Sequence, residues 1–310
     1  MSAIITSHLQ RRFHNTIAVS DLSFEVKPGE IYGLIGPDGA GKTTTLRMLA
    51  GVLKPSSGRA MVLQEDVIRN PEMLRRRIGY MPQHFALYAD LSVLENLTFF
   101  AEVFQVPRVE RTKRIERLLQ FAQLEHFANR PAGKLSGGMK KKLGLACTLI
   151  HSPQLLLLDE PTNGVDPVSR REFWDILSEL HLESVTILIT TSYMDEAERC
   201  NRVGLMFRGC LIQQGEPEAL RLMAPGEMLV LYTPELAKTE EVLPKLSGYI
   251  THQIYGDRLH VFVSETASED QLEALLSDAN IPVHMLYKDE PRLEDAFIHL
   301  IRQARMEANV

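Results

Sequence analysis

The stretch Gly36-Pro37-Asp38-Gly39-Ala40-Gly41-Lys42-Thr43 matches the pattern G-x-x-x-x-G-K-[ST] at every position. A short apolar run at residues 31–35 precedes it and predicts a buried strand, and residues 43–50 follow it and predict a helix. In such a loop, glycines let successive backbone N–H groups surround phosphate oxygens, and the helix start adds its positive dipole end. Lys42 supplies a positive charge for the β- and γ-phosphates, and the Thr43 hydroxyl can bind Mg²⁺. The stretch therefore predicts a phosphate-binding loop.

A second stretch, Leu155-Leu156-Leu157-Leu158-Asp159-Glu160, predicts a buried strand that ends in two carboxylates. Ligands of open α/β sheets bind at the carboxyl ends of the strands, so both acids are expected at the same sheet edge as the loop. Asp159 is the candidate to hold Mg²⁺ through water, and Glu160 is the candidate general base that polarises an attacking water. Acids after a strand are common, so this prediction depends on the loop beside it.

The composition is that of an ordinary globular chain. It has 310 residues, which as a soft prior means about two domains, with 45% hydrophobic and 24% charged residues. The net charge of −6 argues against a broad basic surface, so no nucleic-acid partner is expected. The basic runs at residues 75–77 and 140–142 are predicted to be solvated helix faces. Three cysteines without Cys-x-x-Cys spacing predict neither a disulfide framework nor a zinc site, and favour a reducing cytoplasm.

The hydropathy pattern predicts no membrane-spanning segment. No apolar run approaches the ~20 residues that a spanning helix needs. Residues 1–20 lack the apolar core of a secretory signal, because Arg11 and Arg12 interrupt them. If the protein works at a membrane, another chain is expected to supply the membrane part.

Alternating apolar strands and amphipathic helices between residues 22 and 190 predict an α/β sheet that helices cover. In the middle of the chain, a helical stripe is formed by Ile115, Leu118, Leu119 and Ala122. After residue 223 the pattern is close to β-α-β-β-α-β with a final helix, which predicts a small α+β, ferredoxin-like domain. The step Ala224-Pro225-Gly226 is the predicted boundary. The strands of this second domain are expected at residues 228–232, 249–255, 259–263 and 283–287.

A third stretch, Leu135-Ser136-Gly137-Gly138-Met139, opens a predicted helix ahead of the two acids. The Ser136 hydroxyl and the N–H groups of Gly137 and Gly138 form an anion site at the helix start, and the serine is also an ordinary helix cap. In this order, the loop, the serine-glycine stretch and the acids make the chain resemble an ABC-type ATPase, the nucleotide-binding subunit of an ABC transporter. The common family signature has glutamine where this chain has Met139.

The resemblance implies a P-loop NTPase cassette over residues 1–223, with a RecA-like mixed sheet and a helical subdomain at about 84–150, and an accessory regulatory α+β domain over 226–310. It implies ATP and Mg²⁺ as cofactors. It also implies a dimer of cassettes, in which the serine-glycine stretch of one copy binds the γ-phosphate of ATP held by the other. The residues implied to contact ATP are Phe13, Gly36, Pro37, Asp38, Gly39, Ala40, Gly41, Lys42, Thr43, Thr44, Ser136, Gly137, Gly138 and Asp166.

The same resemblance gives roles to residues outside these motifs. Phe13 matches the aromatic residue that stacks on adenine, an interaction worth roughly 1–3 kcal/mol, although an isolated Phe is more often a core residue. Gln83 matches the glutamine that reaches Mg²⁺ and the attacking water, so the metal-site residues implied are Thr43, Gln83 and Asp159. Residues 84–97 match the surface that contacts the membrane subunit, with plain helix packing as the alternative, and residues 163–166 match the dimer-contact loop.

The chain departs from the family at one position near the γ-phosphate. The family has a histidine just beyond the strand predicted at residues 186–190, and this chain has Ser192 there. Serine is shorter and carries no positive charge at neutral pH. Losing one donor aimed at a developing charge costs about 10²–10³ in rate in other enzymes. The sequence therefore predicts a site that binds ATP well and hydrolyses it slowly, with Glu160, Gln83 and Ser192 as the catalytic residues. The alternative is that Ser192 positions a water and activity is normal.

With the resemblance, the sequence predicts the ATP-binding subunit of an exporter, peripheral on the inner, cytoplasmic face of the cell membrane. Its expected partners are a second cassette, in a homodimer or heterodimer, and an ABC-2-type permease. The motifs resemble the first cassette of bacterial tandem-cassette exporters, and the C-terminal segment resembles the small domain that follows the cassette in ABC-2-type exporters. Two alternatives stay open: a hydrolysis-impaired regulatory cassette that pairs with an active one, and a soluble ABC ATPase that acts on ribosomes or DNA.

Overall fold

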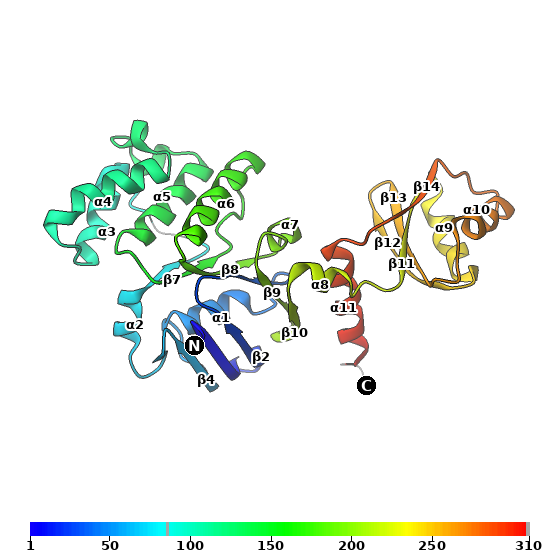
Figure 1. Cartoon of the computed structure of the whole chain (residues 1–310), viewed down its shortest axis with the longest axis horizontal. Helices are drawn as coiled ribbons and strands as arrows, with labels where there is room; N and C mark the ends of the chain where they lie inside the picture. The colour runs from blue at the N-terminus through cyan, green and yellow to red at the C-terminus, as the bar shows by residue number, and fades with distance from the viewer. Residues whose placement is uncertain (85–86, 308–310) are drawn as a thin grey trace. The chain divides into compact units, whose positions relative to one another are not determined.

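A computed structural model describes residues 1–84 and 87–307. The chain divides into two compact units, Met1–Gln214 and Gly215–Val310 (Figure 1). Within the described ranges, no helix combines the length and the apolar character needed to cross a bilayer.

The first unit is built around a six-stranded sheet. Its strands are β3 (Ile31–Ile35), β6 (Ile78–Met81), β7 (Leu155–Asp159), β8 (Thr186–Thr191), β9 (Arg202–Phe207) and β10 (Cys210–Gly215). They lie in the order β10-β9-β3-β8-β7-β6, and the five strands from β9 to β6 pair in parallel. Every residue of β3, β7 and β8 is buried, which explains why these strands are continuous apolar or small-polar runs without alternation.

The register of this sheet brings the carboxyl ends of three neighbouring strands together. Ile35, the last residue of β3, pairs with Thr191 of β8, and Asp159, the last residue of β7, pairs with Thr190. The loops after these strands therefore meet at one sheet edge, where parallel sheets bind ligands.

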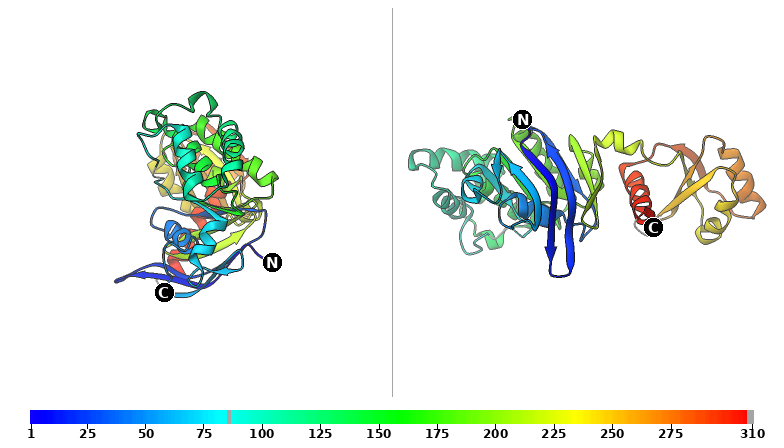
Figure 2. Two further views of the ribbon diagram at one scale, coloured as in Figure 1. Left: turned by 90° about the vertical axis from the view of Figure 1, so that its left-hand side faces the viewer. Right: turned by 90° about the horizontal axis from the view of Figure 1, so that it is seen from below.

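A second sheet packs across helix α1 (Lys42–Leu49). It is antiparallel, in the order β2-β1-β4-β5. Its strands are β1 (Ile4–Phe13), β2 (Thr16–Val26), β4 (Ser57–Val62) and β5 (Glu65–Asp66), of which β1 and β2 form the long hairpin seen in Figure 2. Leu46 and Leu49 of α1 share one apolar core with Leu22 and Phe24 of this sheet and Leu157 of the central sheet. This core fixes the helix that begins at Lys42.

The remaining helices of the first unit are α2 (Pro71–Arg77), α3 (Val93–Val103), α4 (Arg108–Phe121), α5 (Gly137–Leu149), α6 (Pro167–Leu182) and α7 (Met194–Ala197), with short 3-10 turns at Glu125–Phe127 and Ala132–Lys134. The predicted helical stripe lies on α4 and the residue after it, and it is buried. Helix α3 begins at a capping box, in which Ser92 accepts from the N–H of Glu95 and the Glu95 carboxylate accepts from the N–H of Ser92.

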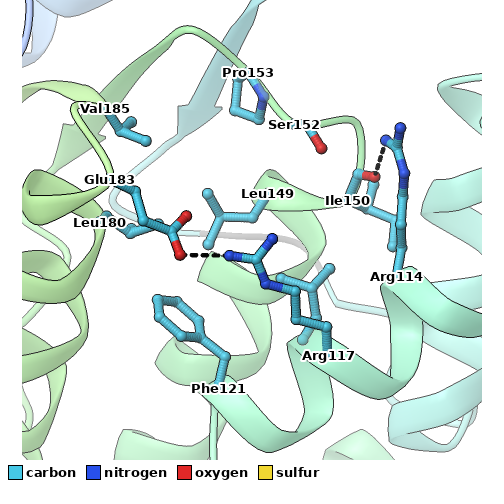
Figure 3. A pocket seen from close by; sticks show the side chains of 11 residues that line it. Arg114, Arg117, Phe121, Leu149, Ile150, Ser152, Pro153, Leu180, Glu183 and Val185 are labelled. Carbon is cyan, nitrogen blue, oxygen red and sulfur yellow. Dashed lines mark hydrogen bonds and ion pairs between the residues drawn. The ribbon is translucent and has the colours of Figure 1, made fainter.

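A cavity of about 170 Å³ lies between α4, the end of α5 and the loop after α6 (Figure 3). Arg117 of α4 forms an ion pair with Glu183, and Nη1 of Arg114 donates to the main-chain oxygen of Ile150 at 3.3 Å. Both partners of the Arg117 pair are largely exposed, so this pair contributes at most about 1 kcal/mol. The two arginines connect α4 to the end of α5 and to the loop after α6. None of the described residues that line this cavity belongs to the predicted nucleotide site.

The second unit contains a four-stranded antiparallel sheet with helices. Its elements are α8 (Pro217–Arg221), β11 (Glu227–Tyr232), α9 (Leu236–Val242), a 3-10 turn at Leu243–Lys245, β12 (Tyr249–Tyr255), β13 (Arg258–Val263), α10 (Glu269–Asp278), β14 (Met285–Asp289) and α11 (Leu293–Glu307). The sheet order is β12-β13-β11-β14, and from β11 to β14 the elements follow the predicted β-α-β-β-α-β pattern. Alternate residues of β11 enter different cores: Leu229 and Leu231 on one face, Met228 and Val230 on the other.

Two boundaries differ from the expectation. The last strand begins at Met285 rather than at residue 283. The compact units divide after Gln214, ahead of the Ala224-Pro225-Gly226 step, because α8 packs with α11. Nη1 of Arg221, at the end of α8, lies 2.9 Å from Oε2 of Glu290. The short helix before the step thus belongs to the second unit, which a local turn signal does not reveal.

Candidate nucleotide-binding site

The phosphate-binding loop connects β3 to α1, as the pattern predicts. A Cβ atom on Gly36 would lie 2.3 Å from the main-chain oxygen of Met206, so no other residue fits there without moving β9. Gly41 has a φ of +103°, and a Cβ there would lie 2.4 Å from the main-chain oxygen of Ala18. Both positions therefore require glycine for close backbone packing and, at Gly41, for a left-handed conformation.

Lys42 is held at the base of this loop. Its Nζ donates to the main-chain oxygens of Gly36 at 2.7 Å and Pro37 at 3.2 Å, and it lies 3.0 Å from Oε1 of Glu160. Both charged side chains are more than nine-tenths buried. The ammonium group is therefore preorganised beside the backbone that would surround phosphate oxygens.

Asp159 has the environment of a metal-binding carboxylate. Its Oδ1 accepts from the hydroxyls of Thr43 and Thr190, each at 2.9 Å. Its Oδ2 is buried and has no hydrogen-bond partner within the part of the chain that the structure describes. Burial raises the pKa of Asp159 above its ordinary value, and the two hydroxyls oppose this shift. An unsatisfied carboxylate oxygen beside the Thr43 hydroxyl fits the oxygen ligands that Mg²⁺ prefers.

Glu160 occupies the centre of the candidate hydrolytic site. Its Oε2 accepts from Nε2 of Gln83 and from Nδ2 of Asn163, both at 3.0 Å, while Oε1 pairs with Lys42. Its backbone has a φ of 44°, and its N–H donates to the Thr190 hydroxyl at 3.0 Å. A left-handed, buried glutamate costs conformational energy, and such strain gathers at functional sites. The carboxylate is thus fixed in place by three residues, Gln83, Asn163 and Lys42, and the main chain of Glu160 is held by Thr190.

Lys42, Thr43 and Glu160 line a cavity of about 520 Å³. Phe13 stands at its margin, 40% exposed, with the guanidinium carbon of Arg11 at 4.4 Å from the ring centroid. A large exposed aromatic ring can stack on a base. The predicted residues that line this cavity are Phe13, Asp38, Gly39, Ala40, Gly41, Lys42, Thr43, Thr44, Gln83 and Glu160.

The serine-glycine stretch lies in a different place. Gly137 lines a second cavity, of about 610 Å³, with Lys140, Lys141 and residues 163–165. Ser136 caps α5 by accepting from the N–H of Met139 at 3.2 Å, and Asp166 caps α6 by accepting from the N–H of Ser169 at 3.0 Å. The bond from Ser169 lowers the pKa of Asp166. The two cavities share Gln83 and Asn163 but present the loop and the serine-glycine stretch separately.

Ser192 is exposed and directly follows β8. The structure adds a residue that sequence reasoning missed here: Glu196 of α7, whose carboxylate is 1% exposed. It accepts from the hydroxyls of Thr162 at 2.6 Å and Thr191 at 2.7 Å, so it joins the loop after the two acids to the turn that carries Ser192. Only these contacts between distant segments reveal it, since a glutamate in a polar stretch gives no local signal.

The prediction of a solvated lysine face on α5 was wrong for two of its three residues. Lys140 is exposed, but Lys142 is buried, with its Nζ 2.7 Å from Oε2 of Glu172 and 3.2 Å from Oε1 of Gln123. The Nζ of Lys141 donates to the main-chain oxygen of Gln83 at 2.9 Å. Helix α5 contacts α3, α4, α6 and β6, so few of its positions remain free for solvated charges.

A phosphate-binding loop, an unsatisfied carboxylate and a fixed glutamate at one sheet edge define a P-loop ATPase. The family model described as "ABC transporter" matches residues 19–163. The chain is 45% identical, over 96% of its own length, to the probable multidrug ABC transporter ATP-binding protein YbhF of Escherichia coli, and it spans 52% of that protein. It is 39% identical to the Nod factor export ATP-binding protein I of Burkholderia lata, covering 94% of this chain and 95% of the relative.

A solved structure gives the same result at the level of the fold. The dimeric post-hydrolysis state of the ATP-binding cassette MJ0796, bound to ADP and Pi, is 25% identical and superposes with a TM-score of 0.63, over 69% of this chain and 98% of that one. The chain belongs to the ABC transporter family, as an ATP-binding protein. The resemblance and the fold class predicted from the sequence are confirmed.

Proposed function

We propose that the chain is the ATP-binding subunit of an exporter, and that it couples Mg-ATP binding and hydrolysis to a separate ABC-2-type permease at the inner face of the membrane. The observation that carries the proposal is the separation of the two nucleotide motifs into two cavities of one chain. Lys42 and Thr43 open into one cavity and Gly137 into the other. A second copy, or a related cassette, would supply the missing half of each site.

In this proposal each side chain has a defined task. Lys42 binds the β- and γ-phosphates, the loop N–H groups surround them, and Ser136 with Gly138 of the partner cassette contacts the γ-phosphate. Thr43, Gln83 and Asp159 would hold Mg²⁺, which supplies charge stabilisation to the transferring phosphoryl group. Glu160 polarises the attacking water, and Gln83 orients the carboxylate. Phe13 stacks on the adenine.

ATP binding shifts the equilibrium from separate cassettes to the closed dimer, because ATP has a higher affinity for the closed dimer. Hydrolysis removes the γ-phosphate that the serine-glycine stretch contacts, so the dimer can open. The surface at residues 84–97, part of which lies outside the described residues, is proposed to contact the permease. The printed names of the relatives, which concern multidrug transport and Nod factor export, support export but name no substrate for this chain.

Nucleotide-dependent pairing tests this proposal. We expect the Glu160→Gln variant, alone or mixed with a candidate partner cassette, to change from a 35.1 kDa monomer to a dimer on addition of Mg-ATP, as measured by mass photometry. The additional change Gly137→Glu places a carboxylate at the helix start and is expected to prevent pairing while ATP binding persists. Binding of ATP without any pairing would contradict the composite site.

Membrane association separates the exporter from a soluble ABC ATPase. On co-expression with a candidate ABC-2-type permease, the chain is expected in the membrane fraction and in the detergent-purified complex. Sedimentation with ribosomes in the same fractionation would favour the soluble alternative.

A second candidate function rests on Ser192, which follows β8 where the family has histidine. We propose that this site hydrolyses ATP slowly and that the chain pairs with a more active cassette. In single-turnover experiments, Ser192→His is expected to raise the hydrolysis rate by about 10- to 10²-fold, because it restores a donor near the γ-phosphate.

Ser192→Ala is the matched control for this prediction. It is expected to leave the rate within twofold, because the serine hydroxyl takes little part in the slow reaction. A histidine variant that is no faster than the natural chain, or an alanine variant that is much slower, would favour a serine that positions a water.

A further inference from the structure

Lys141 is the one residue of the basic run on α5 that reaches the hydrolytic site. It is the fifth residue of a helix whose start carries Ser136 and Gly137. Its Nζ donates to the main-chain oxygen of Gln83 at 2.9 Å. Gln83 follows β6, the edge strand next to β7. It contacts both Lys141 of α5 and Glu160, which follows β7.

The hydrogen bond continues from Gln83 to the catalytic carboxylate. Nε2 of Gln83 donates to Oε2 of Glu160 at 3.0 Å, and Oε1 of Glu160 lies 3.0 Å from Nζ of Lys42. The polar contacts thus form one chain, which runs from Lys141 on α5 through Gln83 and Glu160 to Lys42 on α1. Gln83 lies in the segment after β6, and Glu160 directly follows β7. Each residue in this chain of contacts restrains the position of the next one. Lys141, where it begins, lies on α5, the helix whose start carries the serine-glycine stretch.

The shifted pKa of Lys141 agrees with a side chain that is held in a partly buried position. Burial lowers the pKa of Lys141 below its ordinary value, and the charges of Asp159 and Glu160 offset part of this shift. Lys141 is half-buried and its ammonium group has a defined partner in the Gln83 main-chain oxygen, whereas Lys140 beside it is exposed.

We propose that Lys141 is a positioning residue for ATP hydrolysis: it holds the Gln83 peptide so that the glutamine amide stays in contact with Glu160. This rests on the proposed ATPase function of the same site. It also gives the serine-glycine helix a direct link to the chain's own general base, because a movement of α5 displaces the carbonyl partner of Lys141 and, with it, the Gln83 side chain.

The first test separates positioning from binding. Lys141→Met is expected to lower kcat for ATP hydrolysis by about 10- to 10²-fold, since a small misplacement of a catalytic group has effects of this size. The Kd for ATP is expected to change by less than twofold, because Lys42 and the loop are intact. Lys141→Arg, which keeps a donor at this position, is expected to recover most of kcat. Lys113→Met, on the exposed face of α4, is the matched control and is expected to behave as the natural chain.

A double-mutant cycle then tests the route through Gln83. Gln83→Ala removes the amide that contacts Glu160, so adding Lys141→Met to it is expected to change kcat by less than twofold further. Additive losses in kcat, or a Lys141→Met variant with unchanged kcat, would overturn the inference. These outcomes presuppose hydrolysis by the natural chain. A natural chain that binds no ATP and hydrolyses none would instead contradict the proposed function.

Discussion

Glu160→Gln is expected to lower the rate of ATP hydrolysis by about 10²- to 10⁴-fold, the range that general base catalysis contributes. The glutamate carboxylate accepts on both oxygens, from Gln83 and Asn163 on one and from Lys42 on the other. A glutamine amide has one oxygen and one donor group, so it can satisfy one side only and cannot take a proton from water. Phosphate release under single-turnover conditions measures the effect.

The change should spare nucleotide binding, because the loop, Lys42 and Asp159 are unaltered. We therefore expect an ATP Kd within a few-fold of the natural chain, measured with a fluorescent nucleotide. Glu116→Gln, at an exposed position of α4, makes the same chemical change away from the site and serves as the control. A Glu160→Gln variant with more than a tenth of the natural rate would assign the general base to another group.

Lys42→Met is expected to have a large effect on both binding and stability. Hydrogen bonds to charged groups contribute about 1.5–3 kcal/mol, so loss of the ammonium group is expected to weaken ATP binding by about 10- to 10²-fold. It also leaves Glu160 as a buried carboxylate without its cation, a change that costs about 3–5 kcal/mol when one partner of a buried pair is removed. Urea unfolding of the ligand-free chain measures the second effect, with exposed Lys54→Met as control.

The double variant Lys42→Met with Glu160→Gln separates the two causes. It carries no unpaired buried charge, so most of the lost stability is expected to return while ATP binding stays weak. If the double variant were as unstable as Lys42→Met, the loss would come from altered packing of the loop rather than from the isolated carboxylate.

The linear motifs predicted the elements that form much of the candidate site, because each motif is a local pattern with a local cause. Gly36 and Gly41 are needed where the loop backbone passes close to Met206 and Ala18, and a spacing rule captures this requirement. The strand before Asp159 was evident from its apolar run, and the parallel register brings it beside β3 and β8. Roles given by the resemblance alone, such as those of Phe13 and Ser192, remain predictions.

Other features depend on contacts between distant segments, which no local pattern encodes. The buried Glu196 joins residues 162 and 191, and Lys141 contacts the main chain of Gln83, where any side chain would leave the same carbonyl. The position of α8 follows from its packing with α11 rather than from the turn after it. Charge content suggested solvent for the lysine run, whereas burial of α5 decided the outcome for Lys141 and Lys142.

The buried pair of Lys42 and Glu160 has a consequence for how ATP enters. The lysine already has an anionic partner in the ligand-free chain, so phosphate arrival is an exchange of one counter-charge for another. The affinity for ATP is then expected to reflect the difference in free energy between the contact of Lys42 with Glu160 and its contact with phosphate. Nucleotide binding therefore stays readily reversible. In the proposed mechanism, ATP binding would release Glu160 from Lys42, so the carboxylate would become available to water only after the nucleotide is in place.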